Sequence, residues 1–110
     1  MSVQDNFTLD AGGTLIREFI YKDNEGETIN ITGYQARAQV RRSTFEPVVI
    51  DSVPVIDEET FVITMTWTAA ETSRLVLPNY VYGLEIYDEE SGDVAVLTRG
   101  VITVNQEIVR

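Results

Sequence analysis

Apolar and polar residues alternate along most of this sequence, which is the pattern of strands with one buried and one exposed face. The clearest strand covers residues 34–41, and two aromatic-rich strands cover residues 61–67 and 80–86. Their predicted inward faces carry Tyr34, Ala36, Ala38 and Val40; Phe61, Ile63, Met65 and Trp67; and Tyr80, Tyr82, Leu84 and Ile86. Three faces of this kind are enough to seed a hydrophobic core.

Weaker strand signals and turn residues fill the rest of the chain. Further short runs of strand-forming residues lie at 6–9, 14–21, 28–31, 47–55 and 93–104. Glycine, proline, asparagine and aspartate cluster between the strands, as at residues 11–13, 23–26 and 88–93. This spacing predicts seven or eight strands in an antiparallel β-sandwich or a small barrel. In the last run the inward face switches near residues 98–100, which predicts a β-bulge at Gly100.

One segment predicts a helix instead of a strand. Thr68 has the hydroxyl of an N-cap, and Glu71 supplies a carboxylate three residues later, so the two residues fit a capping box. The helix is limited to one or two turns within residues 68–75. Because it lies between a strand that ends at Trp67 and one that begins near Tyr80, we expect it to be a crossover that connects the two sheets.

Length and composition narrow the class of protein. The 110 residues suit one domain, residues 1–110, with a single core. The sequence contains no cysteine and no histidine, which excludes disulfides, Cys/His zinc sites and histidine-dependent catalysis. A net charge of -10 repels phosphate backbones and anionic lipid, so neither nucleic acid nor a membrane is an expected partner. Residues 1–5 lack the basic and apolar regions of a signal peptide.

Acidic clusters are the first candidates for a site. Residues 23–26 lack the spacing and the distal glutamate of a calcium loop, so a hairpin turn is the preferred interpretation. Residues 88–93 carry four carboxylates that either hold a divalent ion or form a solvated loop, and the solvated loop is preferred. Residues 57–59 are interpreted in the same way. Paired carboxylates for glycoside hydrolysis have no specific signal here. We therefore predict no catalytic residue, no cofactor and no metal ligand.

Arginine supplies nearly all the positive charge, with seven arginines and one lysine among the eight basic residues. Arginine makes planar, bidentate contacts with carboxylates and is enriched at protein interfaces. Arg37 and Arg41 lie on the predicted outward face of the strand at 34–41, and Arg42 follows them. These arginines pair either with acidic loops of a neighbouring copy or with acids across the strands of their own chain.

Several blocks of the sequence resemble one family. They are Asp10-Ala-Gly12; Ile29-Asn-Ile-Thr-Gly-Tyr-Gln-Ala-Arg-Ala-Gln-Val-Arg41; Tyr82-Gly-Leu-Glu-Ile-Tyr-Asp88 with Ser91-Gly-Asp-Val94; and Leu97-Thr-Arg-Gly-Val-Ile-Thr-Val104. With these blocks the chain is similar, over nearly its whole length, to short tailed-bacteriophage virion proteins and to the N-terminal β-sandwich domains of phage upper baseplate proteins. The resemblance implies an antiparallel immunoglobulin-like (Ig-like) β-sandwich that serves as a structural or adaptor piece of a particle, in a ring or trimer. It brings no catalytic residues with it.

The expected function is a non-enzymatic structural or assembly protein of the virion, in the tail, baseplate or neck. It would be made in the cytoplasm of the bacterial host and would contact itself, as a homo-oligomer, and other virion proteins. The net charge of -10 opposes assembly until arginines or partner surfaces offset it, so we expect salt-sensitive association. The interface candidates are Phe7, Arg37, Arg41 and Arg42; Phe7 is included because a terminal strand is the easiest one to exchange between copies.

An alternative function is a carbohydrate-binding or adhesin-like β-sandwich module, assisted by calcium in the acidic loops. Tyr21 or Tyr87 would then stack on a sugar. Calcium would raise the melting temperature by mass action if such a site exists.

Overall fold

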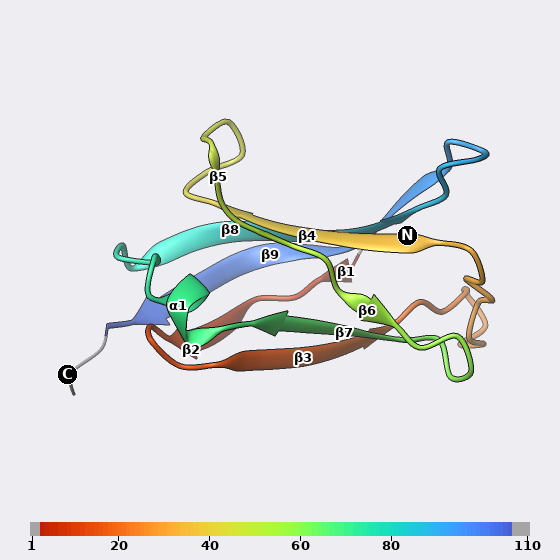
Figure 1. Ribbon diagram of the computed structural model, residues 1–110, viewed down its shortest axis with the longest axis horizontal. Helices are drawn as coiled ribbons and strands as arrows, with labels where there is room; N and C mark the ends of the chain where they lie inside the picture. Colours follow the sequence, from red (N-terminus) through yellow and green to blue (C-terminus); the bar gives the residue numbers. More distant parts are fainter. Residues whose placement is uncertain (1–2, 107–110) are drawn as a thin grey trace.

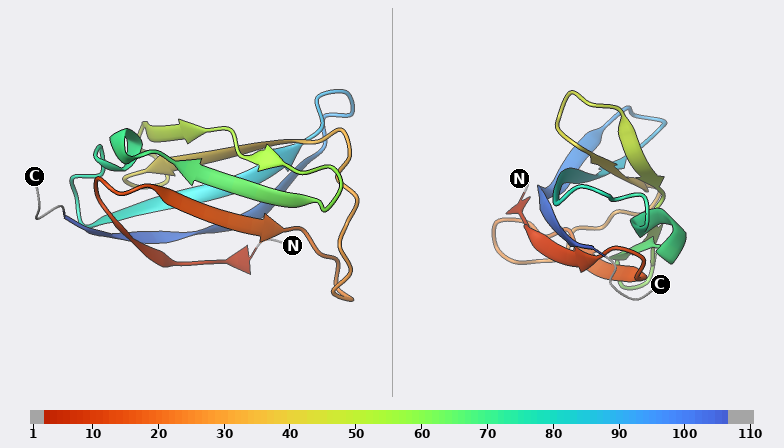
Figure 2. Two further views of the ribbon diagram at one scale, coloured as in Figure 1. Left: turned by 60° about the horizontal axis from the view of Figure 1, so that its bottom comes forward. Right: turned by 90° about the vertical axis from the view of Figure 1, so that its left-hand side faces the viewer.

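Two β-sheets pack face to face in the computed structural model, which describes residues 3–106 (Figures 1 and 2). The larger sheet has the order β1 (Val3–Gln4), β9 (Val94–Asn105), β8 (Asn79–Tyr87), β4 (Gln35–Arg41) and β5 (Val48–Ser52), and β2 (Phe7–Asp10) also pairs with β9. The smaller sheet has the order β3 (Leu15–Ile20), β7 (Val62–Trp67) and β6 (Val55–Ile56). Because β1 and β2 follow one another along β9, they are two halves of one interrupted strand. The predicted all-β sandwich of seven or eight strands is confirmed.

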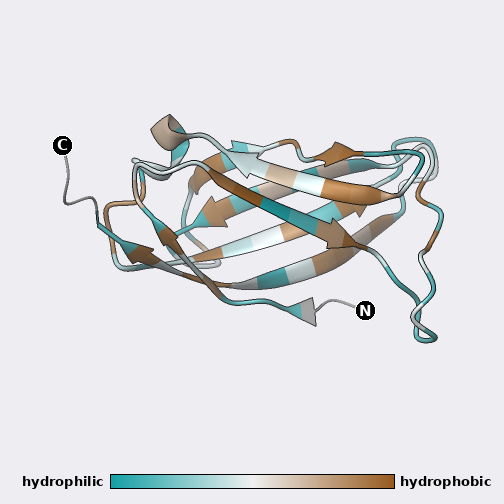
Figure 3. Cartoon of the chain, turned by 90° about the horizontal axis from the view of Figure 1, so that it is seen from below, coloured by the Kyte–Doolittle hydropathy of each residue, from teal (hydrophilic) through white to brown (hydrophobic). Residues whose placement is uncertain are grey.

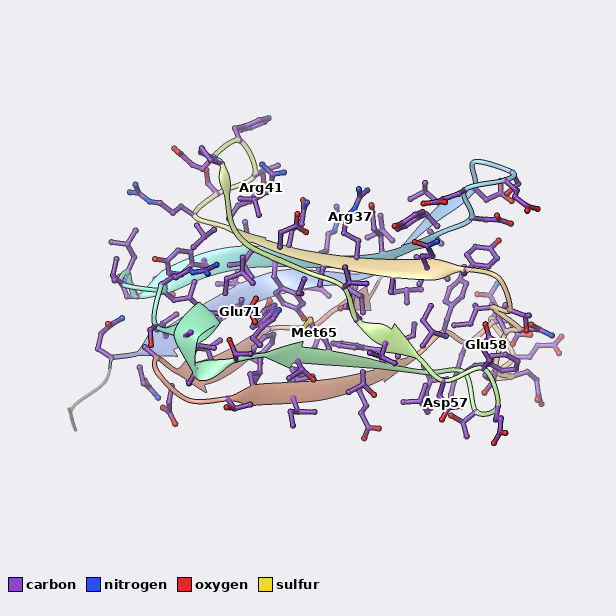
Figure 4. The ribbon with its side chains drawn as sticks, in the orientation of Figure 1. Arg37, Arg41, Asp57, Glu58, Met65 and Glu71 are labelled. Atoms are coloured by element: carbon purple, nitrogen blue, oxygen red, sulfur yellow. The ribbon has the colours of Figure 1, made fainter. Side chains whose placement is uncertain are left out.

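The alternation seen in the sequence places the core between the sheets, and Figure 3 shows hydrophobic and hydrophilic residues alternating along the strands. Met65 lies between the two layers (Figure 4). The buried residues contributed by the three predicted inward faces are Ala36, Ala38, Val40, Ile63, Met65, Trp67, Tyr80, Tyr82, Leu84 and Ile86. Tyr34 and Phe61 were predicted on these faces, but they precede β4 and β7 and are only half-buried.

Two of the weaker strand predictions need correction. Residues 28–31 form no strand, and the chain there makes a single bridge, between Thr28 and Lys22. The predicted strand at residues 47–55 divides into β5 and β6, which belong to different sheets. Pro54 lies at the division, and it has no N–H to continue a ladder, so the chain leaves one sheet there and enters the other.

The N-terminal strand departs from the predicted antiparallel arrangement. β1 and β2 run parallel to β9, with Val3 opposite Thr98 and Phe7 opposite Ile102. Parallel neighbours need a long connection, and here almost the whole chain separates the two strands. Alternation within residues 6–9 predicts a strand at that place but carries no information about its partner.

The bulge in β9 lies at Leu97, so the prediction of a bulge at Gly100 is wrong. The register of β8 against β9 shifts between Leu84 and Glu85, which leaves Leu97 as the extra residue. Gly100 has a different role. The backbone at Asp5, in the break between β1 and β2, passes so close to Gly100 that a Cβ atom there would overlap the Asp5 carbonyl group.

The predicted helical crossover is confirmed as α1 (Ala69–Thr72), which leads from β7 of the smaller sheet to β8 of the larger one. The Glu71 N–H donates to Thr68 Oγ1 at 3.2 Å, and the Thr68 N–H donates to Glu71 Oε1 at 3.0 Å, so the capping box is complete. The helix has a single turn, which is the shorter of the two lengths predicted within residues 68–75. Within the described residues no helix is long and apolar enough to cross a membrane.

The Thr72 hydroxyl ties this helix to the loop after β2. Its oxygen donates to the Gly13 carbonyl at 2.8 Å and accepts from the Gly12 N–H at 3.1 Å, and the side chain is fully buried. Replacing Thr72 by Val leaves both backbone groups without this partner, so we expect the free energy of unfolding to fall by about 1–3 kcal/mol. Urea unfolding measures this loss, with Thr72→Ser, which keeps the hydroxyl, as the control. Equal losses in the two variants would contradict the assignment to the hydroxyl.

Candidate functional site

The solvent-facing side of the three neighbouring strands β9, β8 and β4 is called the outer face below. Cross-strand pairing sets its rows: Tyr87 lies opposite both Gln35 and Val94, and Gly83 lies opposite both Gln39 and Arg99. Its side chains come from Val94, Val96, Arg99 and Val101 on β9; Val81, Glu85 and Tyr87 on β8; and Gln35, Arg37, Gln39 and Arg41 on β4. Two of the predicted interface residues, Arg37 and Arg41, therefore share one surface, on the side away from the smaller sheet (Figure 4).

Arg37 is already paired within its own chain. Its guanidinium forms an ion pair with Glu85, directly opposite on β8, and the Nε–H donates to Glu85 Oε1 at 3.0 Å. Its Cζ atom lies 5.4 Å from the centre of the Tyr87 ring. The hydrogen bond to the Glu85 carboxylate, together with its charge, raises the pKa of Arg37 above its usual range. For this arginine the intramolecular alternative considered from the sequence is confirmed.

Arg41 and Arg99 leave positive charge without an ionic partner. Arg41 donates from Nη1 to the Glu46 carbonyl at 2.7 Å and from Nη2 to Gln39 Oε1 at 3.2 Å. Neither Arg41 nor Arg99 forms an ion pair with any residue in the described part of the chain. Sequence reasoning missed Arg99. Arg99 joins the outer face because the register of β9 against β8 places it opposite Gly83. The sequence alone does not reveal this register.

The outer face is hollowed along its middle into a groove of about 650 Å³. Gly83 lies in this groove, and a Cβ atom built on it would meet no other atom within 4 Å. The absence of a side chain at the centre of β8 therefore leaves open space on the surface. The arginines and valines of the neighbouring strands line that space.

The two ends of the outer face rise on the same side of the larger sheet and differ in charge (Figures 1 and 2). At one end, called the basic end, Arg41 and Arg42 lead into the loop before β5, where the Phe45 side chain is 97% exposed. At the other end the loop between β8 and β9, residues 88–93, carries four carboxylates and is called the acidic end. Figure 1 shows the loop at residues 88–93 at one end of the long axis and the loop before β5 on the opposite half of the molecule.

The acidic loops are ordered by their own hydrogen bonds. Asp88 Oδ1 accepts from the Glu90 N–H at 3.0 Å, and Asp57 Oδ1 accepts from the Glu59 N–H at 2.8 Å. Asp23 Oδ1 accepts from the N–H groups of residues 25 and 27. These are turns closed by aspartate side chains. In the part of the chain that is described, no three acidic side chains gather where they would hold a metal ion.

Phe7, the fourth predicted interface residue, does not lie on the outer face. Its ring centre is 5.0 Å from that of Tyr82 and 6.1 Å from that of Trp67, and the Arg17 Cζ atom lies 4.4 Å above it. Phe7 therefore lies half-buried at the edge where the two sheets meet, apart from Arg37 and Arg41. Its exchange between copies stays a prediction.

Tyr82 joins the N-terminal strand to the core. Its hydroxyl donates to the Asp5 carbonyl at 2.5 Å, and the Asp5 carboxylate forms an ion pair with Arg17 of β3 at 2.6 Å. Burial raises the pKa of the Tyr82 phenol above its ordinary value, and a hydrogen bond with Thr98 acts in the opposite direction. One tyrosine therefore links both halves of the sandwich through the break between β1 and β2.

The raised pKa of Tyr82 predicts a loss of stability at alkaline pH. Because the neutral phenol is favoured in the folded protein, its contribution is complete below the ordinary tyrosine pKa of about 10 and is lost as the pH rises through the folded-state pKa. Tyr82→Phe also removes the hydrogen bond to Asp5, at a cost of about 0.5–1.5 kcal/mol near neutral pH. We expect the stability advantage of wild type over Tyr82→Phe to shrink above about pH 10 in denaturant titrations. A constant difference would contradict this.

Tyr80, two residues before Tyr82, closes the turn that leads from α1 to β8. Its hydroxyl oxygen accepts from the N–H groups of Val76 and Leu77 at 3.0 and 3.1 Å. A tyrosine in this position, bonded back to the preceding backbone, is a hallmark of immunoglobulin-like sandwiches. In those domains the residue two places further on is often a disulfide cysteine, and here it is Tyr82.

The strand order, the two facing sheets and this tyrosine define an immunoglobulin-like β-sandwich. The chain is similar in structure to the natural killer cell receptor NKp44, with a TM-score of 0.53, 14% identity, and coverage of 96% of this chain and 99% of that one. This likeness concerns the fold alone. No protein-family model matches the sequence, and no curated protein matches it either.

Proposed function

We propose that this protein is a non-enzymatic structural or assembly protein of a tailed-bacteriophage virion, a component of the tail, baseplate or neck that acts through protein-protein contacts. Its partners are other copies of itself and other virion proteins, and it is made in the cytoplasm of the bacterial host before assembly. The sequence blocks that resemble phage virion proteins motivate the phage context. The surface of the sandwich motivates the mode of action.

The outer face is the observation that carries the proposal of protein contacts. The exposed fractions of Val94, Val96 and Val101 on β9 are 58%, 44% and 38%, and these valines adjoin arginines on the same surface. Single exposed apolar residues are common, but grouped ones mark interaction sites. Arginine beside apolar side chains is typical of protein interfaces, whereas lysine is depleted there.

The alternative of a carbohydrate-binding module relied on exposed tyrosines. Tyr87 does lie on the outer face, but its hydroxyl donates to Gln35 Oε1 at 3.1 Å and the Arg37 guanidinium lies over its ring. A sugar stacking on this face of the ring would have to displace Arg37 from both Tyr87 and Glu85. No observation in the described part of the chain favours the alternative over protein contacts.

Peptide mass spectrometry of gradient-purified particles tests the proposed function. The particles come from a lysate of the bacterium that carries this gene, and the major capsid protein serves as the internal standard. We expect the chain to co-sediment with the particles at a constant ratio to the capsid protein across the gradient fractions. Detection in the whole lysate together with absence from purified particles would refute virion membership.

A further inference from the structure

We propose that the outer face is the interface of a symmetric homodimer, in which the acidic end of each copy lies against the basic end of the other. The two-fold axis lies between the two outer faces, parallel to them and perpendicular to the long axis of the molecule. It crosses β8 near Glu85, about midway between Arg41, which lies opposite Val81, and the loop at residues 88–93. This inference rests on the proposed function and names the first partner of that surface, a second copy of this chain.

The shape of the outer face makes its two ends the first points of contact between two copies. The two ends rise on the same side and the groove lies between them, so the half-turn brings each raised end opposite the other end of the partner (Figure 1). In a two-fold interface the same surface is used by both chains, so any contact between two different ends occurs twice.

The charges on the outer face favour a copy of the same chain over a uniformly charged partner. Glu89 and Glu90 at the acidic end are exposed, and at the basic end Arg41 and Arg42 form no ion pair within the described residues. Glu46 belongs to the same basic loop and offsets part of its charge. A uniformly acidic partner would be repelled by one end and a uniformly basic partner by the other. A second copy in the two-fold arrangement matches both ends at once.

The outline of the molecule leaves room for a standard interface on one face. The molecule extends over 43 × 28 × 25 Å, so the outline of a face along its long axis is at most 43 by 28 Å. A standard interface needs about 800 Å² from each partner. The exposed valines of β9 and the Phe45 ring supply apolar surface for burial, and the charged ends fix the orientation.

A charge-swap experiment tests the arrangement. In one variant Arg41 and Arg42 become Glu, and in the other Glu89 and Glu90 become Lys. Each variant alone places like charges at both contacts, so both variants are expected to be monomers of 12.4 kDa by native mass spectrometry. The 1:1 mixture has opposite charges at both contacts, and we expect it to form a heterodimer of twice that mass.

Net charge and folding are controlled in the same experiment. The first variant changes the net charge from -10 to -14 and the second changes it from -10 to -6, so their heterodimer carries the same total as the wild-type pair. If association depended only on repulsion between the net charges, the Glu89→Lys/Glu90→Lys variant, at -6, would associate more strongly than wild type. The proposed contacts predict instead that this variant is a monomer. Lys22→Glu with Arg74→Glu, both outside the outer face, also gives -14 and is expected to dimerise like wild type. Circular dichroism verifies that all variants are folded.

The outcomes separate this inference from the proposed function. A monomeric wild type, a dimeric Arg41→Glu/Arg42→Glu variant, or a mixture that stays monomeric would overturn the dimer, and so would a wild-type trimer. Loss of the dimer in the Lys22→Glu/Arg74→Glu control would overturn the assigned contacts. None of these results changes whether the chain is present in purified particles. Absence from particles would in turn refute virion membership without affecting the dimer.

Discussion

Replacing Trp67 by alanine is expected to lower the free energy of unfolding by about 3–5 kcal/mol, the range found when a buried aromatic side chain is truncated. Trp67 is fully buried, and its ring adjoins those of Phe7 and Tyr82 at centre distances of 6.1 and 6.4 Å. Domains of this kind are stable by only about 5–15 kcal/mol in total. The variant is therefore expected to lose a large share of its stability, which urea unfolding with tryptophan-independent detection by circular dichroism measures.

Trp67→Phe is the matched control for this prediction. It keeps an aromatic ring in the core but loses part of the volume and the hydrogen bond from Nε1 to Ser52 Oγ, which is 3.0 Å long. We expect a loss clearly smaller than that of Trp67→Ala, because the residual cavity is smaller. A loss under about 1 kcal/mol in Trp67→Ala would contradict the central role of this ring in the core.

Replacing Gly100 by alanine is expected to destabilise the protein by about 1–3 kcal/mol, as other overpacked sites do. The new Cβ atom would overlap the Asp5 carbonyl, so the break between β1 and β2 must move away from β9. That movement weakens the hydrogen bonds from Tyr82 to Asp5 and from the Val101 N–H to Asn6 Oδ1. We therefore expect hydrogen exchange to accelerate at residues 3–10 more than in the rest of the sandwich.

Gly83→Ala is the control for the Gly100 substitution, at protein concentrations low enough to keep the chain monomeric. Gly83 lies on the adjacent strand with open space where its Cβ atom would be, so the alanine is expected to change the free energy of unfolding by no more than about 0.5 kcal/mol. Similar losses and similar exchange rates in the two variants would show that the N-terminal strand does not depend on the bare backbone at Gly100.

Local patterns predicted the parts of this fold that depend on neighbours in the sequence. The alternation at residues 34–41 and 80–86 predicted β4 and β8, because the face of each residue follows directly from strand geometry. The capping box of Thr68 and Glu71 predicted α1 for the same reason, since both partners lie within four residues. These predictions needed no knowledge of the rest of the molecule.

Features that depend on distant residues were not predicted. The parallel pairing of β2 with β9 joins residues almost a whole chain apart, and the glycine it requires was interpreted as a bulge. The candidate site shows the same division. Arg37 and Arg41 were predicted to share an outward face from their spacing, but Arg99 joins them only through the register of β9. Phe7 was predicted at an interface from its position near the terminus, and its packing against Tyr82 depends on the tertiary structure.

Light scattering after size exclusion, over a wide range of concentrations of the wild-type protein, tests most directly whether this protein works through contacts between copies. At about 0.15 M salt the Debye length is about 8 Å, so the repulsion between two chains of charge -10 is screened at most distances while close contacts persist. We expect a mass of twice 12.4 kDa at high concentration that declines on dilution. The dimer is expected to weaken at about 0.01 M salt, where the repulsion extends about 30 Å. A mass of 12.4 kDa at every protein concentration and every salt concentration would contradict the proposed contacts between copies.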